Sequence, residues 1–305
     1  MTTEELYTEL LGGLSAELAL SPDLPDETAE TTLKALWHAA AGKPCSAARA
    51  LGTDLPELRD EQVVALRDAV DRRLAGVPLM QITGRVEFMG LELLFEPNVC
   101  LVRPETEILG RHAVKVLSNC LTRERDPLMI DIGCGSGNLS CGIANKIPKL
   151  RVHSVDALES CVELTKRNID HCGLKDRICV SQGDLFAPLK ELGLSGAVDV
   201  VVCNPPYISS ARLKTDRSHL LEHEPHEALD GGAYGFSVHQ RLIKEAPEFL
   251  MPGGWLLFEF GAGQHRQVQS LFERSKAFDL VEFATDAHGV ERVGAGRRTI
   301  SPGIR

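Results

Sequence analysis

The chain has 305 residues, of which 43% are hydrophobic and 25% are charged, as in ordinary globular proteins. Its net charge is −10, from 33 basic and 43 acidic side chains, which argues against a surface that tracks nucleic-acid phosphates. The acidic start and the lack of an apolar run of ~18 residues predict no signal peptide, transit peptide or membrane span. Nine cysteines without a CxxC spacing predict reduced thiols in a cytoplasmic protein.

The first 76 residues are predicted to form a small helical domain. The segments EELYTELLGGLSAEL and DEQVVALRDAVDRRLAG carry apolar residues at steps of three and four, and Pro44 and Pro56 separate short pieces. Next, GRVEFMGLELLFEPN alternates in hydropathy, with Gly90 at a turn position, which predicts a β-hairpin at about 85–96. We expect this hairpin to form a linker, residues 77–103, between two domains.

Residues 104–305 are predicted to form the catalytic domain, because strands and helices alternate there. This pattern indicates a parallel sheet with helices on both faces, whose ligands bind outside the carboxyl ends of the strands. The strands are expected at 128–132, 151–156, 178–182, 198–203, 254–260 and 280–285. The helices are expected at 105–121, 138–147, 158–171, 237–250 and 264–275.

The segment LMIDIGCGSGNLS (128–140) predicts a nucleoside-binding loop. Glycines at Gly133, Gly135 and Gly137 would let the backbone approach a ligand closely. Asp156, at the end of the next strand, is placed to accept hydrogen bonds from a ribose. The spacing is shorter than in dinucleotide-binding loops and no lysine follows to hold phosphates, which favours S-adenosylmethionine. The alternative is a glycine-rich turn that binds no ligand.

The next strand ends in VSQGDLF (180–186). Asp184 could accept a hydrogen bond from the amino group of adenine, with Leu185 or Phe186 against the ring. The alternative is that Asp184 caps a helix.

The corner NPPY (204–207) follows the strand-like run DVVVC. Proline cannot donate to a ladder, so the chain leaves the sheet stiffly here, beside the glycine loop. The Asn204 side-chain oxygen and the Pro205 carbonyl can each accept one N–H of a planar –NH₂ group and favour positive charge developing on its nitrogen. Pro205 and Pro206 would hold this geometry, and Tyr207 offers a flat face. The corner predicts methyl transfer to a planar nitrogen; the alternative is a buried Asn-Pro turn.

Five motifs together resemble the release-factor glutamine methyltransferases, the HemK/PrmC family. They are RPETE (103–107), DIGCGSG (131–137), NPPYI (204–208), EPHEAL (224–229) and LLFEFG (256–261). The resemblance runs from about Pro78 to Arg297. It implies an α/β, Rossmann-like class I S-adenosyl-L-methionine-dependent methyltransferase, with a mostly parallel seven-stranded sheet, an N-terminal helical bundle and a β-hairpin linker. The product would be S-adenosyl-L-homocysteine.

The resemblance also implies a substrate, the glutamine amide in the GGQ motif of peptide-chain release factors. We expect a cytoplasmic monomer that contacts the release factor and neither nucleic acid nor membrane. The expected cofactor-binding residues are Gly133, Cys134, Gly135, Ser136, Gly137, Asp156, Asp184, Leu185 and Asn204. The expected catalytic residues are Asn204, Pro205, Pro206 and Tyr207, which would also hold the glutamine together with Arg103, Glu105 and Thr106.

Two departures from the family pattern leave the substrate open. Val102 stands where proline is usual, and Gln81 stands where tyrosine is usual. The alternatives are methylation of another protein or of a small amide or amine, methylation of an adenine amino group in nucleic acid, and a binding module without activity. The histidines His219, His223 and His226 resemble a metal cluster, but Pro225 interrupts their spacing, so we expect no metal.

Overall fold

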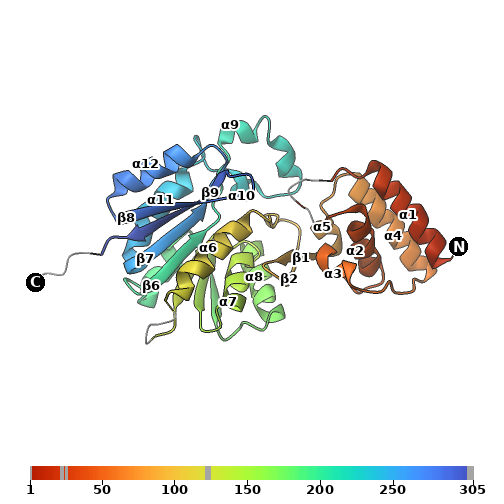
Figure 1. Ribbon diagram of the computed structural model, residues 1–305, viewed down its shortest axis with the longest axis horizontal. Helices are drawn as coiled ribbons and strands as arrows, with labels where there is room; N and C mark the ends of the chain where they lie inside the picture. Colours follow the sequence, from red (N-terminus) through yellow and green to blue (C-terminus); the bar gives the residue numbers. More distant parts are fainter. Residues whose placement is uncertain (1, 21–23, 25–26, 121–124, 301–305) are drawn as a thin grey trace, which may run out of the picture. The chain divides into compact units, whose positions relative to one another are not determined.

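The computed structural model describes residues 2–20, 24, 27–120 and 125–300 (Figure 1). The chain divides into two compact units, Met1–Pro97 and Asn98–Arg305. The boundary between them lies inside the predicted linker, 77–103.

The first unit is a small bundle of helices. Its core is apolar, and Trp37 lies in it with its indole Nε1 donating to the Pro56 carbonyl over 2.8 Å. Thr2 and Thr28 begin two of the helices with capping boxes, in which the threonine hydroxyl accepts a backbone N–H three residues on. The helices are α1 (Thr3–Glu17), α2 (Ala29–Ala40), α3 (Ala47–Leu51), α4 (Asp60–Leu74) and α5 (Leu79–Thr83).

The predicted hairpin is present in this first unit. Strands β1 (Arg85–Phe88) and β2 (Leu91–Leu94) pair antiparallel around Met89 and Gly90, both of which have positive φ. This is the two-residue turn that matches the twist of a hairpin. Glu92 accepts hydrogen bonds from the Ser46 N–H at 2.8 Å and from Arg49 Nη1 at 3.2 Å, and so ties the hairpin to the start of α3.

The second unit contains a seven-stranded sheet in the order β5-β4-β3-β6-β7-β9-β8, parallel except for β9 (Figure 1). Its strands are β3 (Leu128–Ile132), β4 (Arg151–Asp156), β5 (Ile178–Gln182), β6 (Val198–Cys203), β7 (Leu250–Glu259), β8 (Phe278–Thr285) and β9 (Glu291–Arg298). Its helices are α6 (Thr106–Ser118), α7 (Asn138–Lys146), α8 (Glu159–His171), α9 (Ser210–Leu213), α10 (His226–Leu229), α11 (Ser237–Phe249) and α12 (His265–Ser275), with short 3₁₀ turns at Ala187–Leu192 and Ser218–Glu222.

Four of the predicted strands, β3 to β6, have the expected bounds, and the predicted class I methyltransferase fold is confirmed. Strand β7 begins earlier than expected, at Leu250, and continues past an irregularity in its pairing with β6. Helix α6 ends at Ser118; position 121 of the predicted helix lies outside the described residues.

Strand β9 was not predicted, because glycines are depleted in strands and this one contains Gly294 and Gly296. The structure explains both glycines. A Cβ atom on Gly296 would lie 2.4 Å from Phe272 Cε1, and one on Gly294 would lie 3.1 Å from Val268. The two positions let α12 pack closely onto the sheet.

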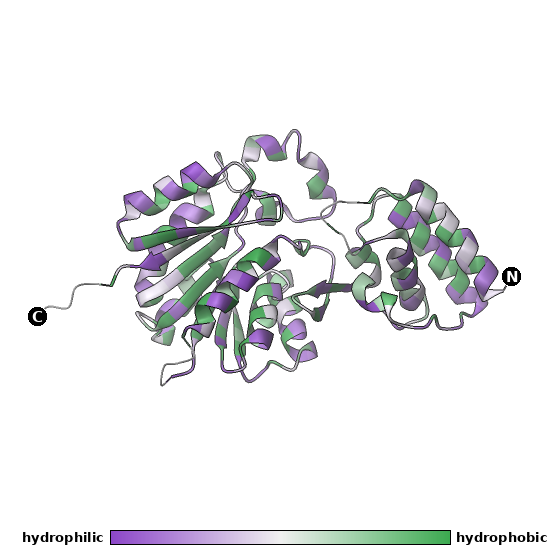
Figure 2. Cartoon of the chain, in the orientation of Figure 1, coloured by the Kyte–Doolittle hydropathy of each residue, from purple (hydrophilic) through white to green (hydrophobic). Residues whose placement is uncertain are grey.

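Strand β6 is buried along its whole length, as expected of a central strand in a parallel sheet. Figure 2 shows hydrophobic residues along the central strands, whereas hydrophobic and hydrophilic residues alternate on helices such as α12. Helices α11 and α12 cover one face through a core that includes Leu242, Ala246, Val268 and Phe272. Among the described residues, no helix is long and apolar enough to cross a membrane.

Candidate active site

The three predicted ligand segments follow three neighbouring strands. Ile132 of β3 is paired with Val155 of β4 on one side and with Cys203 of β6 on the other. The residues that follow these strands therefore meet at one edge of the sheet. The glycine loop, Asp156 and the NPPY corner are thus brought together, as the sequence predicts.

The glycine loop has the backbone that only glycine adopts readily. Gly133, Gly135 and Gly137 have φ of 68°, 57° and 76°. The N–H groups of Gly133 and Cys134 donate to the Val155 carbonyl at 2.8 and 3.1 Å, which ties the loop to β4. A Cβ atom on Gly133 or Gly135 would meet no atom within 4 Å, so the loop faces open space.

Helix α8 supports the loop from behind, which the sequence analysis missed. Thr165 Oγ1 donates to the Gly135 carbonyl at 3.0 Å, and Asn168 Nδ2 donates to the Ser136 carbonyl at 2.8 Å. Both side chains are fully buried. A Cβ atom on Gly137 would lie 2.9 Å from Thr165 Cγ2, so this glycine is also required by packing. The sequence feature that could have indicated this support is the pair Thr165 and Asn168, two polar residues three positions apart on the apolar face of an amphipathic helix.

Asp156 lies against the loop and is nearly buried. Its carboxylate accepts the Gly135 N–H at 2.9 Å and the Leu158 N–H at 3.0 Å. Burial raises the pKa of this carboxyl, and these backbone donors oppose the shift. The Cys161 thiol and the Ala157 N–H also donate hydrogen bonds to this carboxylate.

Asp131, inside β3, is a second carboxylate that the sequence analysis missed. It accepts from both the N–H and the hydroxyl of Ser140, at 3.1 and 2.5 Å. Its Oδ1 is buried and has no hydrogen-bond partner in the described part of the chain. Burial raises the pKa of Asp131 to about 7. The sequence feature that could have indicated this residue is an acidic side chain inside an apolar strand.

Asp184 is placed differently from the other cofactor candidates. Its side chain is 67% exposed and pairs with Arg241 of α11 through contacts of 2.8 and 2.9 Å. Leu185 is half-buried, with φ of 47°. Phe186 is fully buried and stacks on Phe249, so it cannot contact a bound ring. A contact between Asp184 and adenine stays a prediction.

The NPPY corner is held by two glycine-containing segments. The Tyr207 carbonyl accepts from Gln264 Nε2 at 3.0 Å. A Cβ atom on Gly231 would lie 2.7 Å from the Pro206 carbonyl oxygen. A Cβ atom on Gly235 would lie 2.4 Å from the Tyr207 carbonyl oxygen. Burial raises the pKa of the Tyr207 phenol well above its usual value, so the phenol stays neutral. The corner is therefore rigid because of its surroundings as well as its prolines.

Asn204 is oriented by a hydrogen bond from its own side chain. Its Nδ2 donates to Thr106 Oγ1 at 3.0 Å, and Thr106 Oγ1 donates to Glu259 Oε2 at 2.7 Å. Within the described residues, neither Asn204 Oδ1 nor the Pro205 carbonyl accepts a hydrogen bond from the chain. These two oxygens are the acceptors that the sequence analysis assigned to a substrate –NH₂.

Arg103 and Glu105 lie close enough to Glu259 for their charges to act on its carboxyl. Arg103 contacts the buried carboxylate of Glu224 through Nη1 at 2.9 Å and Nη2 at 2.5 Å. The same carboxylate accepts the Leu101 N–H at 2.9 Å and the Cys100 thiol at 3.0 Å. Arg103 thus fixes the EPHEAL segment, while Glu105 precedes α6 with its Oε2 buried and without a partner in the described chain.

Cys134 and Cys203, the two cysteines beside the glycine loop and the NPPY corner, are both buried. Burial raises the pKa of the Cys134 and Cys203 thiols well above the usual value, so both remain neutral and act as packing residues. In the part of the chain that the structure describes, no three His, Cys, Asp or Glu side chains gather at one point that could hold a metal ion.

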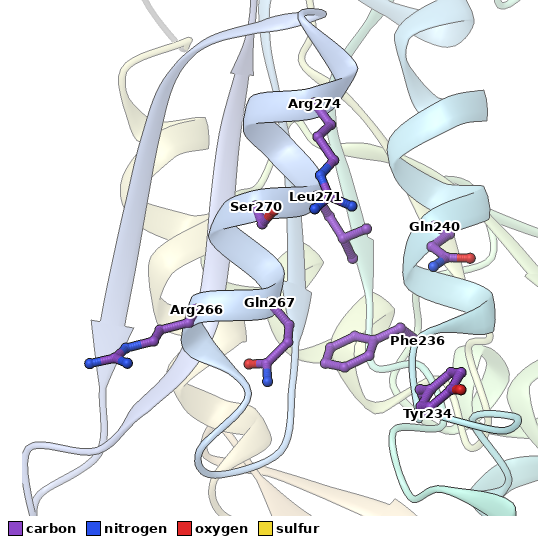
Figure 3. A pocket seen from close by; sticks show the side chains of 8 residues that line it. All are labelled: Tyr234, Phe236, Gln240, Arg266, Gln267, Ser270, Leu271 and Arg274. Carbon is purple, nitrogen blue, oxygen red and sulfur yellow. The ribbon is translucent and has the colours of Figure 1, made fainter.

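A groove of about 530 Å³ lies between α11 and α12 (Figure 3). Phe236 and Leu271 point toward its middle, and Arg266 points away from it. None of the predicted site residues lines this groove; its lining is Tyr234, Phe236, Gln240, Arg266, Gln267, Ser270, Leu271 and Arg274.

Comparison with known proteins matches residues 112–233 to the family described as Methyltransferase small domain. The chain is 35% identical to the release factor glutamine methyltransferase of Geobacter sulfurreducens, over 79% of this chain and 80% of that one. It is 30% identical to the protein of the same name from Bradyrhizobium diazoefficiens, over 89% of both. Among solved structures, the chain resembles the hMettl16 catalytic domain in complex with the MAT2A 3′UTR hairpin 6, with a TM-score of 0.53. The match covers 78% of this chain and 84% of that one at 14% sequence identity, so the likeness concerns the fold alone.

Proposed function

The chain belongs to the release factor glutamine methyltransferase family, and from this we propose that it transfers a methyl group from S-adenosyl-L-methionine to the glutamine amide nitrogen in the GGQ motif of a release factor. The observation that carries the proposal is the pair of oxygens on Asn204 and Pro205, beside the glycine loop, which accept no hydrogen bond from the described residues.

The residues of the loop fit the cofactor. Gly133 and Gly135 face open space, and the Asp156 carboxylate beside them would accept a hydrogen bond from a ribose hydroxyl. S-adenosyl-L-methionine, when bound, supplies an electrophilic methyl group. Leu185 would contact the adenine, and Cys134, Ser136 and Gly137 would complete the loop beneath it.

The NPPY corner would hold the glutamine amide for attack. An amide nitrogen is a weak nucleophile because its lone pair is delocalised. Asn204 Oδ1 and the Pro205 carbonyl would each accept one of its N–H bonds, which orients the nitrogen and favours the positive charge that develops on it. Neither acceptor is basic enough to deprotonate the amide, so the nitrogen would keep both protons while the N–CH₃ bond forms and the S–CH₃ bond breaks. One proton would then leave to solvent, with S-adenosyl-L-homocysteine as the other product. Tyr207 would pack against the planar amide.

Arg103, Glu105 and Thr106 would shape the substrate site from the other side. Arg103 is already paired with Glu224, so we assign it to holding the EPHEAL segment and not to direct contact with the glutamine. The release-factor substrate and the nine free cysteines support a cytoplasmic location.

The test uses purified protein, labelled S-adenosyl-L-methionine and a bacterial release factor, beside a factor in which GGQ is changed to GGA. We expect label on the first factor and none on the second. Label on both release factors would show that the methyl group is added to a residue other than the GGQ glutamine. Label on neither, with cofactor bound, would reject the release factor as substrate and favour another protein or a small amide.

A further inference from the structure

Two buried side chains, Thr106 and Glu259, form a line behind the half-buried side chain of Asn204. Glu259 ends β7 and is 0% exposed, and Thr106 begins α6 and is 1% exposed. Cys203 and Phe258 are paired across β6 and β7, so Asn204 and Glu259 follow neighbouring positions in the sheet. The hydrogen bonds run from Asn204 Nδ2 to Thr106 Oγ1 and from Thr106 Oγ1 to Glu259 Oε2.

The direction of these bonds is set by the carboxylate. Burial raises the pKa of the Glu259 carboxyl, while the Thr106 hydroxyl and the charges of Arg292 and Arg103 oppose that shift and favour the ionised form. An ionised carboxylate only accepts hydrogen bonds, so the single hydroxyl proton of Thr106 points to Glu259. Thr106 Oγ1 can then only accept from Asn204, which must turn its NH₂ group inward. The Asn204 Oδ1 is thereby turned outward. If the Asn204 amide were inverted, its NH₂ group would face the substrate –NH₂. Both groups are hydrogen-bond donors, so no hydrogen bond could form between them.

A purely structural role does not explain the carboxylate well. A buried charge costs stability unless it is fully paired, and an apolar residue of similar volume is often as good or better. Glu259 Oε1 is buried and has no hydrogen-bond partner among the described residues. The arrangement therefore leaves one carboxylate oxygen unsatisfied while the other specifies the orientation of Thr106.

We propose that Glu259, acting through Thr106, is a positioning residue that fixes the Asn204 amide with its oxygen toward the substrate. This inference rests on the proposed function for its consequence in catalysis. It assigns a role to a residue at the end of β7 that contacts neither substrate nor cofactor. It also explains why the RPETE segment, far from NPPY in the chain, belongs to the same site.

The test compares two substitutions of Thr106 that differ in one group. Thr106→Val keeps the shape and removes the hydroxyl, whereas Thr106→Ser keeps the hydroxyl. We expect Thr106→Val to lower kcat by about 10- to 100-fold, as loss of a supporting partner does elsewhere. The KM for S-adenosyl-L-methionine should stay close to wild type, whereas the Tm should fall in Thr106→Val, because the buried Glu259 carboxylate loses its hydrogen-bond donor. Thr106→Ser should restore most of kcat and of the Tm. Glu259→Gln, whose amide can accept or donate, should also lower kcat.

A second measurement reads the amide without any substrate. In ¹⁵N-labelled protein, the side-chain NH₂ signals of Asn204 are identified by their absence in Asn204→Ala. We expect one downfield, slowly exchanging proton in wild type and Thr106→Ser, and its loss in Thr106→Val.

Three results would overturn the inference: unchanged kcat and amide signals in Thr106→Val, equal losses in the valine and serine variants, or unchanged kcat in Glu259→Gln. If wild-type protein fails to methylate the release factor, the proposed function fails, and the amide signals still decide how Asn204 is held.

Discussion

Ile132 and Cys203 are direct partners in the parallel ladder between β3 and β6. The residues that follow them, Gly133 and Asn204, therefore begin the glycine loop and the NPPY corner at neighbouring points of one sheet edge. This register places the glycine loop beside the two oxygens that we propose hold the substrate amide. The site depends on strand pairing, so substitutions in the corner should change chemistry without changing the fold.

Asn204→Ala should abolish most methyl transfer and leave cofactor binding intact. The substitution removes the outward Oδ1, and loss of one such preorganised group costs about 10²–10³-fold in kcat. Methyl incorporation and equilibrium dialysis with labelled S-adenosyl-L-methionine measure the two effects separately. A variant with kcat within a few-fold of wild type would show that Asn204 does not hold the reacting amide.

Gly137→Ala should destabilise the protein more than Gly135→Ala. Both glycines have positive φ, which costs alanine about 1–2 kcal/mol. Only at Gly137 would the new Cβ also meet Thr165 Cγ2, at 2.9 Å, with an overpacking cost of about 1–3 kcal/mol. Urea unfolding gives the free energies. Adding Thr165→Ser, which removes Cγ2, should recover part of the loss for Gly137→Ala; no recovery would mean that backbone strain alone is responsible.

The sequence predicted which segments meet at the site, but it did not predict the residues that hold those segments in place. Glycines, acids and prolines at strand ends report their positions directly, because the carboxyl ends of parallel strands meet at one edge. Thr165, Asn168 and Glu259 could not be assigned this way, since their partners are backbone groups or side chains far along the chain. A contact of Arg103 with the substrate stays a prediction, and its pairing with Glu224, 121 positions away, was not predicted. Such pairings follow from tertiary packing, which local patterns do not encode.

Gly296→Ala should destabilise the sheet through a contact with Phe272. The new Cβ would lie 2.4 Å from Phe272 Cε1, and overpacking of this kind costs about 1–3 kcal/mol. In a Phe272→Leu background the same substitution should cost less, because the ring edge is gone. A double-mutant cycle in urea measures the coupling. Additive effects would show that β9 or α12 moves to relieve the contact.

The Arg103–Glu224 pair should make stability depend on pH in the acid range. The Glu224 side chain is fully buried, and although burial alone would raise its pKa, the Arg103 guanidinium and the other donors hold that pKa below the ordinary value of 4.5. A carboxyl with a depressed folded-state pKa contributes stability that is complete above the unfolded-state pKa. That stability is lost as pH falls through the folded-state value.

Glu224→Gln should therefore destabilise the protein by about 2–3 kcal/mol at neutral pH, because it leaves Arg103 without its countercharge. The same variant should lose less stability than wild type between about pH 5 and the acid limit, since the titrating carboxyl is gone. Urea unfolding at several pH values measures both effects. The matched control is Glu222→Gln, an exposed neighbour expected to change stability by no more than about 0.5 kcal/mol. Parallel pH profiles for wild type and Glu224→Gln would show that Glu224 is not the group whose protonation weakens the fold.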